Sequence, residues 1–323
     1  MKKTLKVLLG AAILVTEVFA LALPILTTSA KADGAIQAIT HAGFGGGTDV
    51  TTRMMLLRTR RYLKQDMQLV NKKGGGGAAS MDYMMTLPAD GQHTLTWTTG
   101  HAVSMALGKT KVKLSDMQPL ARGTDDPQLF VVNCKNDIKD AKKFISAQKS
   151  KSLKYGTTHV GGIDDVSAIA FTKKGKLTDP TIVAYKGVAP IKTNLIKGDI
   201  DVGVLNLGEA VTEIEDGTLC VSVVLASKRM DKLNNVPTAT ELGIPVVLST
   251  VRGFVTRKGV PADRKKQLED AMIKAMEHKY FQSFLTDIGL DSTSVVGADE
   301  WGKQMEVMLA EMTAQLKALG YIN

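Results

Sequence analysis

The sequence predicts an α/β protein built as two units, each with a mostly parallel sheet flanked by helices. Its 323 residues are enough for about two domains, and a hydrophobic content of 44% is ample for two cores. Strand-like runs alternate with helix-like runs through most of the chain, which is typical of βαβ units. The alternation begins anew near residue 129, which indicates a second unit over about residues 129–250.

The first 32 residues are expected to be a secretory signal peptide. Early lysines give a basic start, residues 7–25 are mostly apolar, and Ala30-Lys31-Ala32 is a small-x-small cleavage site. About 20 apolar residues could also remain as an anchor helix across a bilayer. Glu17 within the run and the cleavage site favour removal after Ala32, so the mature protein is expected to be exported to the periplasm. No cysteine lies near the junction, which disfavours a lipid anchor.

The charge pattern disfavours nucleic acid as a partner. The formal net charge is +9, and removal of a leader with four lysines and one glutamate leaves +6. Lysines are scattered among acidic residues, and the basic cluster at residues 58–64 has the spacing of a solvated helix face. At 5% aromatic residues, the chain is also poor in stacking side chains for bases. A modest positive field instead favours encounter with an anionic small molecule.

Cysteine and histidine usage predicts neither a metal nor a cofactor. The chain has two cysteines, Cys134 and Cys220, both in β-like runs, and two buried thiols are favoured over a disulfide, although the sequence leaves both open. Five scattered histidines and two distant cysteines do not give the ligand spacing of a metal site.

The first unit begins with a strand over residues 35–40 that enters a glycine-rich loop. A helix is expected from Thr48, a good N-cap, with Asp49 in its first turn and an apolar stripe through Val50, Met54 and Leu57. A strand over 67–71, a second glycine loop at 74–77, a helix over 78–87 and a strand over 94–99 follow. A short helical stretch ends this part.

The second unit repeats the alternation. Strands are expected over 128–133, 153–158, 181–185, 199–206 and 219–226, and helices over 140–150, 168–174, 189–196 and 209–214. The remainder reads as helical, with one helix starting near Pro261. A last helix after residue 299 carries a core-facing stripe of Trp301, methionines and leucines and stops at Gly320.

The loop from His41 to Asp49, HAGFGGGTD, carries the clearest chemical signal. A Walker A motif would require a lysine after Gly47, and the dinucleotide fingerprint would require glycine where Thr48 stands. A loop of backbone N–H groups at a helix N-terminus can hold an anion without any catalytic side chain. The sequence therefore predicts an anion site there and disfavours nucleotides, although glycine could also serve a tight turn.

Catalytic constellations are not found in the sequence. There is no G-x-S-x-G elbow and no H-E-x-x-H helix. The five histidines are isolated in sequence. His101 and His159 carry weak functional weight, because each follows a predicted strand beside glycine, where α/β sheets bind ligands.

Four motifs in this order resemble one family. HAGFGGGTDVTTR, LVNKKGGGGAAS with PADGQHTL, YKGVAPIKTNLIKGDIDV and NVPTATELGIP are similar to segments of the tripartite tricarboxylate transporter substrate-binding receptors, the Bug family. The resemblance spans about residues 33–323. It implies a two-domain periplasmic binding protein of the Venus flytrap type, which closes over a small carboxylate and delivers it to large and small membrane subunits.

The resemblance also implies the domains and the site. Domain 1 would comprise residues 33–128 plus 251–323, and domain 2 residues 129–250. A monomer without cofactor or enzymatic activity is expected. The ligand-binding residues implied by the motifs and the strand ends are Phe44, Gly45, Gly46, Gly47, Thr48, Asp49, Thr99, His101, Thr157, Thr158, Gly161, Gly162, Tyr185, Lys186 and Asn206.

Three departures from the family pattern bear on the ligand. Leu205 stands where many members have aspartate, which favours a plain carboxylate over an amino-group ligand. Asp164 and Asp165 replace the serines and histidine of the facing loop and would repel an anion unless they face away. Phe44 replaces a small residue and could narrow the pocket, stack on the ligand or simply pack. The alternatives are an exported α/β enzyme acting on an anionic substrate, or a ligand sensor domain.

Overall fold

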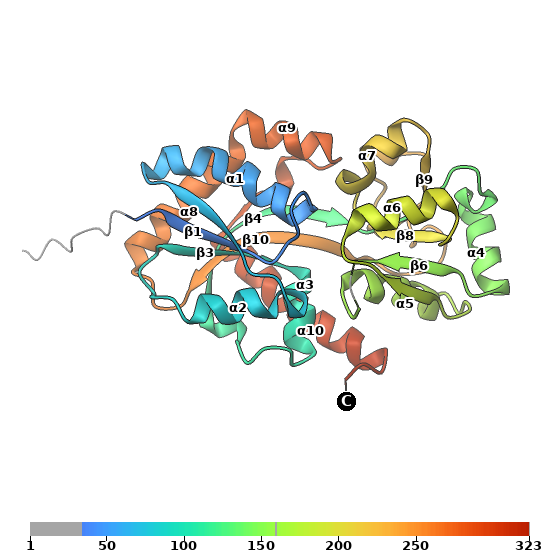
Figure 1. Ribbon diagram of the computed structural model, residues 1–323, viewed down its shortest axis with the longest axis horizontal. Helices are drawn as coiled ribbons and strands as arrows, with labels where there is room; N and C mark the ends of the chain where they lie inside the picture. The colour runs from blue at the N-terminus through green and yellow to red at the C-terminus, as the bar shows by residue number, and fades with distance from the viewer. Residues whose placement is uncertain (1–33, 159, 323) are drawn as a thin grey trace, which may run out of the picture. The chain divides into compact units, whose positions relative to one another are not determined.

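The chain folds into two sheets, each flanked by helices on both faces (Figure 1). The computed structural model describes residues 34–158 and 160–322. The expected signal peptide, residues 1–32, and His159 lie outside the described residues. Within the described ranges, no helix is long and apolar enough to cross a membrane.

The first sheet has the strand order β11-β4-β10-β3-β1-β2. Its parallel part consists of β1 (Ile36–Thr40), β2 (Met67–Asn71) and β3 (His93–Thr98). Its antiparallel part consists of β4 (Met117–Pro127), β10 (Ser249–Arg257) and β11 (Val296–Gly297). The sheet is therefore mixed rather than mostly parallel, because the long strands β4 and β10, which the sequence pattern did not predict, join its parallel core.

Helices cover both faces of the first sheet (Figure 1). One face carries α1 (Gly47–Leu63), α8 (Ala262–Glu277) and α9 (Lys279–Asp287), and the other carries α2 (Ala78–Met85), α3 (Thr99–Ala106) and α10 (Ala298–Ala318). Trp301 of α10 packs on Trp97 of β3 with ring centroids 5.7 Å apart, and both indoles are fully buried. The predicted core-facing stripe of the last helix is confirmed at Trp301, Met305 and Met312.

Helix α1 differs from its prediction in two respects. It begins one residue before Thr48, and Gly46 is the N-cap. Its buried face is lined by threonines, whereas Leu57 of the predicted apolar stripe is 47% exposed. The hydroxyls of Thr52 and Thr59 donate to carbonyls four residues earlier, at 2.7 and 2.8 Å. This internal hydrogen bonding satisfies the hydroxyl donors, so the threonines can be buried, and Thr52 Oγ1 also lies 2.8 Å from Thr96 Oγ1 of β3.

The second sheet has the strand order β7-β6-β8-β5-β9. Its strands are β5 (Leu129–Asn133), β6 (Lys154–Thr157), β7 (Thr181–Ala184), β8 (Val202–Leu205) and β9 (Leu219–Val224). β6, β7 and β8 are parallel, and β5 is antiparallel to β8 and β9. This sheet is mixed as well.

Alternation along β5 explains how the second sheet is covered. Leu129 and Val131 join one apolar cluster with α6 (Val188–Lys197) and α7 (Leu207–Glu215). Phe130 and Val132 join another with α4 (Ala141–Ser150) and α5 (Ile163–Lys174). Successive strand residues point to opposite faces, so one strand anchors helices on both sides. Helix α5 starts five residues earlier than predicted, with Gly162 as its N-cap.

Cys134 and Cys220 form a disulfide, with Cα atoms 5.0 Å apart. The preference for two buried thiols was therefore wrong. β5 and β9 are hydrogen-bonded neighbours that pair Val132 with Cys220, and the backbone N–H of Cys134 donates to the Thr218 carbonyl at 3.1 Å. Adjacent antiparallel strands thus bring together two cysteines 86 residues apart in sequence.

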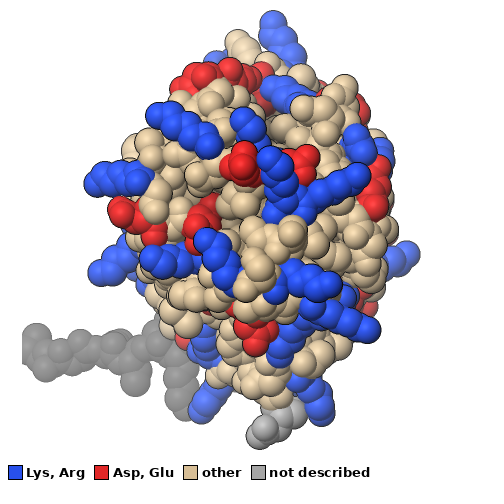
Figure 2. All heavy atoms as spheres, turned by 90° about the vertical axis from the view of Figure 1, so that its right-hand side faces the viewer, with Lys and Arg blue, Asp and Glu red and all other residues tan. Residues whose placement is uncertain are grey.

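The chain passes directly from a strand of the first sheet to a strand of the second at Gln128. β4 leads through Gln128 directly into β5, and the Gln128 backbone N–H donates to the Leu248 carbonyl, just before β10, at 3.0 Å. On the side of the second sheet, basic side chains are spread over the surface with acidic ones between them (Figure 2). That distribution agrees with the scattered charge seen in the sequence.

Candidate ligand-binding site

The predicted ligand-binding residues follow the carboxyl ends of parallel strands in both sheets. The loop from Phe44 to Asp49 follows β1, and Thr99 follows β3. In the second sheet Thr157 ends β6, and β7 and β8 are followed by Tyr185 and Asn206. The carboxyl edge of parallel strands is where open α/β sheets bind ligands. The Tyr185 N–H donates to the Thr157 carbonyl at 2.8 Å, which joins two of these strand ends.

The first glycine loop is closed by its own hydrogen bonds. Gly45 has a left-handed backbone with φ of 75°, which favours glycine, and its N–H donates to Asp49 Oδ2 at 3.0 Å. The N–H of Gly46 donates to the Gly43 carbonyl at 3.1 Å. Asp49 is buried and also accepts from Arg53 Nε at 2.9 Å. The amides of Gly45 and Gly46, which were expected to face a ligand, are therefore engaged inside the loop.

Phe44 projects from this loop into solvent. Its side chain is 86% exposed, and the Arg53 guanidinium lies over the ring, 5.2 Å from its centroid. Packing of Phe44 into the protein interior, one of the alternatives considered from the sequence, is therefore wrong.

The facing loop uses its two aspartates as internal acceptors. Asp164 Oδ2 accepts the N–H of Thr158 at 2.9 Å and its hydroxyl at 2.6 Å. Asp165 Oδ2 accepts the N–H of Gly161 at 2.6 Å. Asp164 Oδ1 accepts from Gln128 Nε2 at 3.1 Å, which ties the loop to the connection between the sheets. Both carboxylates are buried, so they serve the loop's own amides rather than facing solvent.

The two loops share one local design. In each, a glycine with positive φ precedes the N-cap glycine, and an aspartate in the third helical position accepts the N–H of that first glycine. The pairs are Gly45 with Asp49 and Gly161 with Asp165. Each loop therefore leads into a helix whose first-turn N–H groups have no acceptor within the helix, the feature that favours anions at helix N-termini.

Arg252 of β10 joins residues from both parts of the site. Its Nε donates to Thr48 Oγ1 at 3.2 Å and its Nη2 to Asn206 Oδ1 at 3.0 Å. Its Nη1 forms a 3.0 Å ion pair with Asp126 Oδ2, and both side chains are 3% exposed. Burial raises the pKa of Asp126 to about 7, although the guanidinium of Arg252 opposes the rise. The structure thus brings Thr48 and Asn206 together through a buried arginine.

Asn206 is also the N-cap of α7, where it forms a capping box with Glu209. The Asn206 N–H donates to Glu209 Oε2 at 3.1 Å, and Asn206 Nδ2 donates to the carbonyls of Asp126 and Pro127, both at 3.0 Å. Glu209 also lies beside Gly47 at the start of α1, whose backbone opposes the rise of the pKa of Glu209. Burial raises the pKa of Glu209.

His101 is fully buried in the first turn of α3, with both ring nitrogens engaged. Nδ1 accepts the Thr98 N–H at 3.0 Å, and Nε2 lies 3.0 Å from Ser80 Oγ of α2. Burial lowers its pKa well below the ordinary value, so the ring is neutral and donates through Nε2. The Thr99 hydroxyl donates to the Ser249 carbonyl at 3.0 Å and accepts the Val251 N–H at 2.9 Å. These contacts link α2, α3 and β10.

The remaining predicted residues differ in exposure. Lys186 is exposed and Tyr185 is partly buried. The Thr157 hydroxyl is buried and makes no hydrogen bond within the described residues. His159 lies outside them.

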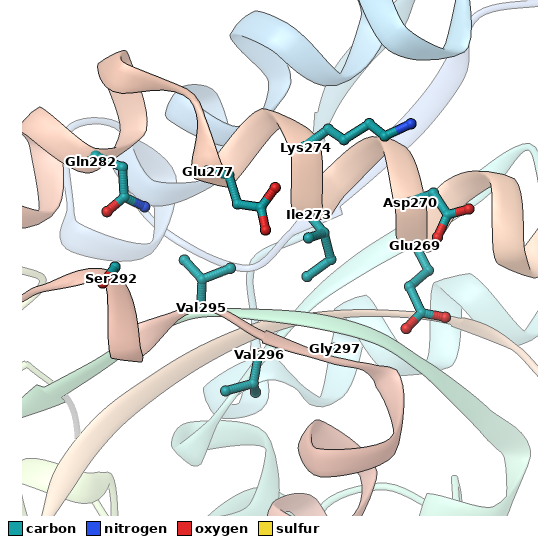
Figure 3. Close-up of a pocket in the computed structure, with 10 residues that line it drawn as sticks. All are labelled: Glu269, Asp270, Ile273, Lys274, Glu277, Gln282, Ser292, Val295, Val296 and Gly297. Atoms are coloured by element: carbon teal, nitrogen blue, oxygen red, sulfur yellow. The ribbon is translucent and has the colours of Figure 1, made fainter.

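A cavity of about 690 Å³ lies elsewhere, between α8 and the chain leading into β11 (Figure 3). It is lined by Glu269, Asp270, Ile273, Lys274, Glu277, Gln282, Ser292, Val295, Val296 and Gly297. None of the predicted ligand-binding residues belongs to this lining, and its carboxylates outnumber its single lysine. The cavity is therefore a poor match for an anionic ligand.

The sequence reasoning missed Arg252, Asp126 and Glu209. The first two lie on β10 and β4, where polar residues interrupt the apolar pattern that would predict a strand. The shared structure of the two loops was predictable, because Gly45 and Asp49 have the same spacing in the sequence as Gly161 and Asp165.

Comparison with known proteins identifies related chains. Residues 51–319 match the family described as tripartite tricarboxylate transporter family receptor. Protein BugT of Bordetella pertussis is 26% identical over 219 residues, which cover 65% of this chain and 66% of BugT.

Solved structures share the fold. MatC from Rhodopseudomonas palustris with bound malate aligns with a TM-score of 0.78 at 22% identity, covering 87% of this chain and 98% of MatC. A second R. palustris protein, with adipate, aligns with a TM-score of 0.80 at 21% identity, covering 88% of this chain and 97% of that protein. The predicted two-domain α/β fold of a periplasmic binding protein is thereby confirmed.

Proposed function

The chain belongs to the tripartite tricarboxylate transporter receptor family, and we propose that it is a periplasmic receptor for a small organic carboxylate. The ligand would bind between the loops at residues 43–49 and 157–165 and be delivered to the membrane subunits of a transporter. Two structural neighbours with bound malate and adipate support a carboxylate as the ligand class.

The observation that carries this proposal is the shared design of the two loops. Each presents the start of a helix, and each supplies an internal aspartate that fixes the loop. A carboxylate at a helix N-terminus is favoured by the free N–H groups and by the helix dipole. Because Asp49 and Asp165 are hydrogen-bonded within their loops, they stabilise the loop geometry that would present those amides.

Hydroxyl groups at the strand ends would complete recognition. Thr48 Oγ1 accepts from Arg252, which leaves its proton for a ligand oxygen. The buried Thr157 hydroxyl, which lacks a partner among the described residues, is a second donor. Lys186, exposed after β7, adds a positive charge. These donors suit a ligand rich in oxygen acceptors.

Delivery would follow from closure of the two domains. A ligand that contacts both loops binds the closed form better than the open form and shifts the population toward it. A transporter that recognises the closed form would then receive loaded receptor.

A thermal-shift screen against mono-, di- and tricarboxylates, with hits confirmed by calorimetry, tests the proposal. A ligand at a hundredfold excess over its Kd stabilises the folded state by about 2.7 kcal/mol. We expect one ligand per chain and no product. Absence of binding to every carboxylate, or turnover of one of them, would contradict a receptor function.

A glycine variant tests the loop assignment. A Cβ atom at Gly46 would lie 3.3 Å from the Gly43 carbonyl oxygen, so Gly46→Val should shift the first loop and weaken binding. Gly34→Val is the matched control, because a Cβ there meets nothing within 4 Å. Unchanged affinity of the Gly46 variant would remove this loop from the site.

A further inference from the structure

Glu209 places a carboxylate of the second sheet's α7 at the start of α1. Its Oε2 accepts the Asn206 N–H at 3.1 Å, and the carboxylate also lies beside the backbone of Gly47. A Cβ atom on Gly47 would lie 3.3 Å from Glu209 Oε1. The carboxylate therefore lies next to the N-termini of both α7 and α1.

The charged groups around Glu209 come from three other elements. Arg252 of β10 attracts the carboxylate, and Asp126 of β4 and Asp164 of α5 repel it. A Cβ on Gly47 would lie 2.6 Å from Arg252 Nη2, so guanidinium and carboxylate both adjoin the first residue of α1. The local arrangement is that of an anion placed beside a helix start and an arginine.

We propose that Glu209 is a specificity-determining residue, an internal carboxylate that occupies the anion position at the start of α1 and competes with the ligand's carboxylate. This inference rests on the function proposed above. A ligand carboxylate that binds at the Gly47 amide must displace Glu209 or be repelled by its like charge. Displacement lowers the apparent affinity, because only a fraction of the protein molecules then has the anion position open. Repulsion lowers the affinity directly. Ligands that make few other contacts with the protein therefore retain the lowest affinity.

The competition depends on pH in a defined direction. Burial raises the pKa of Glu209, and protonation removes the charge that opposes an anionic ligand. The affinity of the wild-type protein for a carboxylate should therefore increase as pH falls. In Glu209→Gln this increase should be smaller, because Asp126, Asp164 and Arg252 are common to both proteins.

The test compares Glu209→Ala and Glu209→Gln with Glu213→Gln. Glu213 is a carboxylate one turn further along α7, and it pairs with Lys192 at 2.6 Å instead of reaching α1. Each protein is titrated with malate and with adipate by calorimetry, at pH 8 and at pH 5.5. Circular dichroism confirms that each variant is folded, and the isosteric glutamine provides a second test should the alanine variant fail to fold.

We expect Glu209→Ala to bind at least one probe about tenfold more tightly than wild type, a typical effect for a hydrogen bond to a charged group. Glu209→Gln should show a smaller gain, and Glu213→Gln none. Equal or weaker binding by both Glu209 variants, with wild type binding normally, overturns this inference but leaves the receptor function intact. No binding of malate, adipate or other carboxylates by any of the four proteins overturns both.

Discussion

Asp165 Oδ2 accepts the backbone N–H of Gly161 at 2.6 Å, so this carboxylate stabilises the loop that precedes α5. The acidic facing loop seemed unsuited to an anion. The structure shows the same contact in the first loop, between Asp49 and Gly45 at 3.0 Å. Each aspartate therefore accepts a hydrogen bond within its own loop, at the start of α1 or of α5.

Asp165→Ala should weaken carboxylate binding. The substitution removes the acceptor of the Gly161 N–H, and loss of one such hydrogen bond costs about 1 kcal/mol of stability. Asp140→Ala is the matched control, because Asp140 caps α4 by accepting from Lys142 and Lys143 at 3.0 and 2.9 Å. Denaturant unfolding should show similar losses for both variants, and calorimetry a loss of affinity for Asp165→Ala alone. Equal affinities would separate this loop from ligand binding.

The disulfide should contribute strongly to stability. Cys134 and Cys220 close a loop of 86 residues, and cross-linking a loop of that size stabilises a protein by about 3–5 kcal/mol. Guanidinium unfolding of the native protein and of the Cys134→Ser/Cys220→Ser double variant measures the difference. Coincident unfolding curves, or two titratable thiols in the unreduced native protein, would contradict the bridge.

Arg252→Met should be strongly destabilising. The substitution leaves Asp126 buried without its counterion, and breaking a buried pair costs about 3–5 kcal/mol. Arg229→Met breaks a pair with Glu241 whose side chains are 42% and 45% exposed, and it should cost at most about 1 kcal/mol. Similar losses in the free energy of unfolding for the two variants, measured in urea, would contradict a larger contribution of the buried pair.

The buried Asp126 also predicts a pH dependence of stability. Its folded pKa of about 7 lies above the ordinary 3.8, so between these values the folded state binds more protons than the unfolded state. The contribution of Asp126 to the free energy of unfolding therefore falls as pH rises from about 4 to 7. Urea unfolding at pH 5 and pH 8 should show a larger loss for wild type than for Asp126→Asn. An equal or smaller loss would contradict the raised pKa.

Elements with a clear hydrophobic period were predictable from the sequence. β2 matches its predicted range, and the apolar stripe of α10 is buried as expected. β4 and β10 were missed because neither shows an apolar alternation. MQPLARGTDDP contains prolines, an arginine and aspartates, and STVRGFVTR contains two arginines and a glycine. Their burial depends on neighbouring strands and helices on both sides, which no local pattern reveals.

The same reason limited the prediction of the site. The glycine loop predicted Thr48, since turn chemistry is local, and the family resemblance predicted Asn206. Arg252 connects these two residues from β10, far along the chain, so its role depends on tertiary structure. The disulfide was missed for a similar reason, because pairing of β5 with β9 is a property of the sheet.

Hydrogen exchange measured by mass spectrometry, with and without a saturating carboxylate from the screen, tests the central claim most directly. Binding between the two loops predicts slower exchange in residues 43–50 and in residues 157–166 at the same ligand concentration. Protection of residues 269–297 alone, around the cavity between α8 and β11, would contradict the account and place the ligand elsewhere.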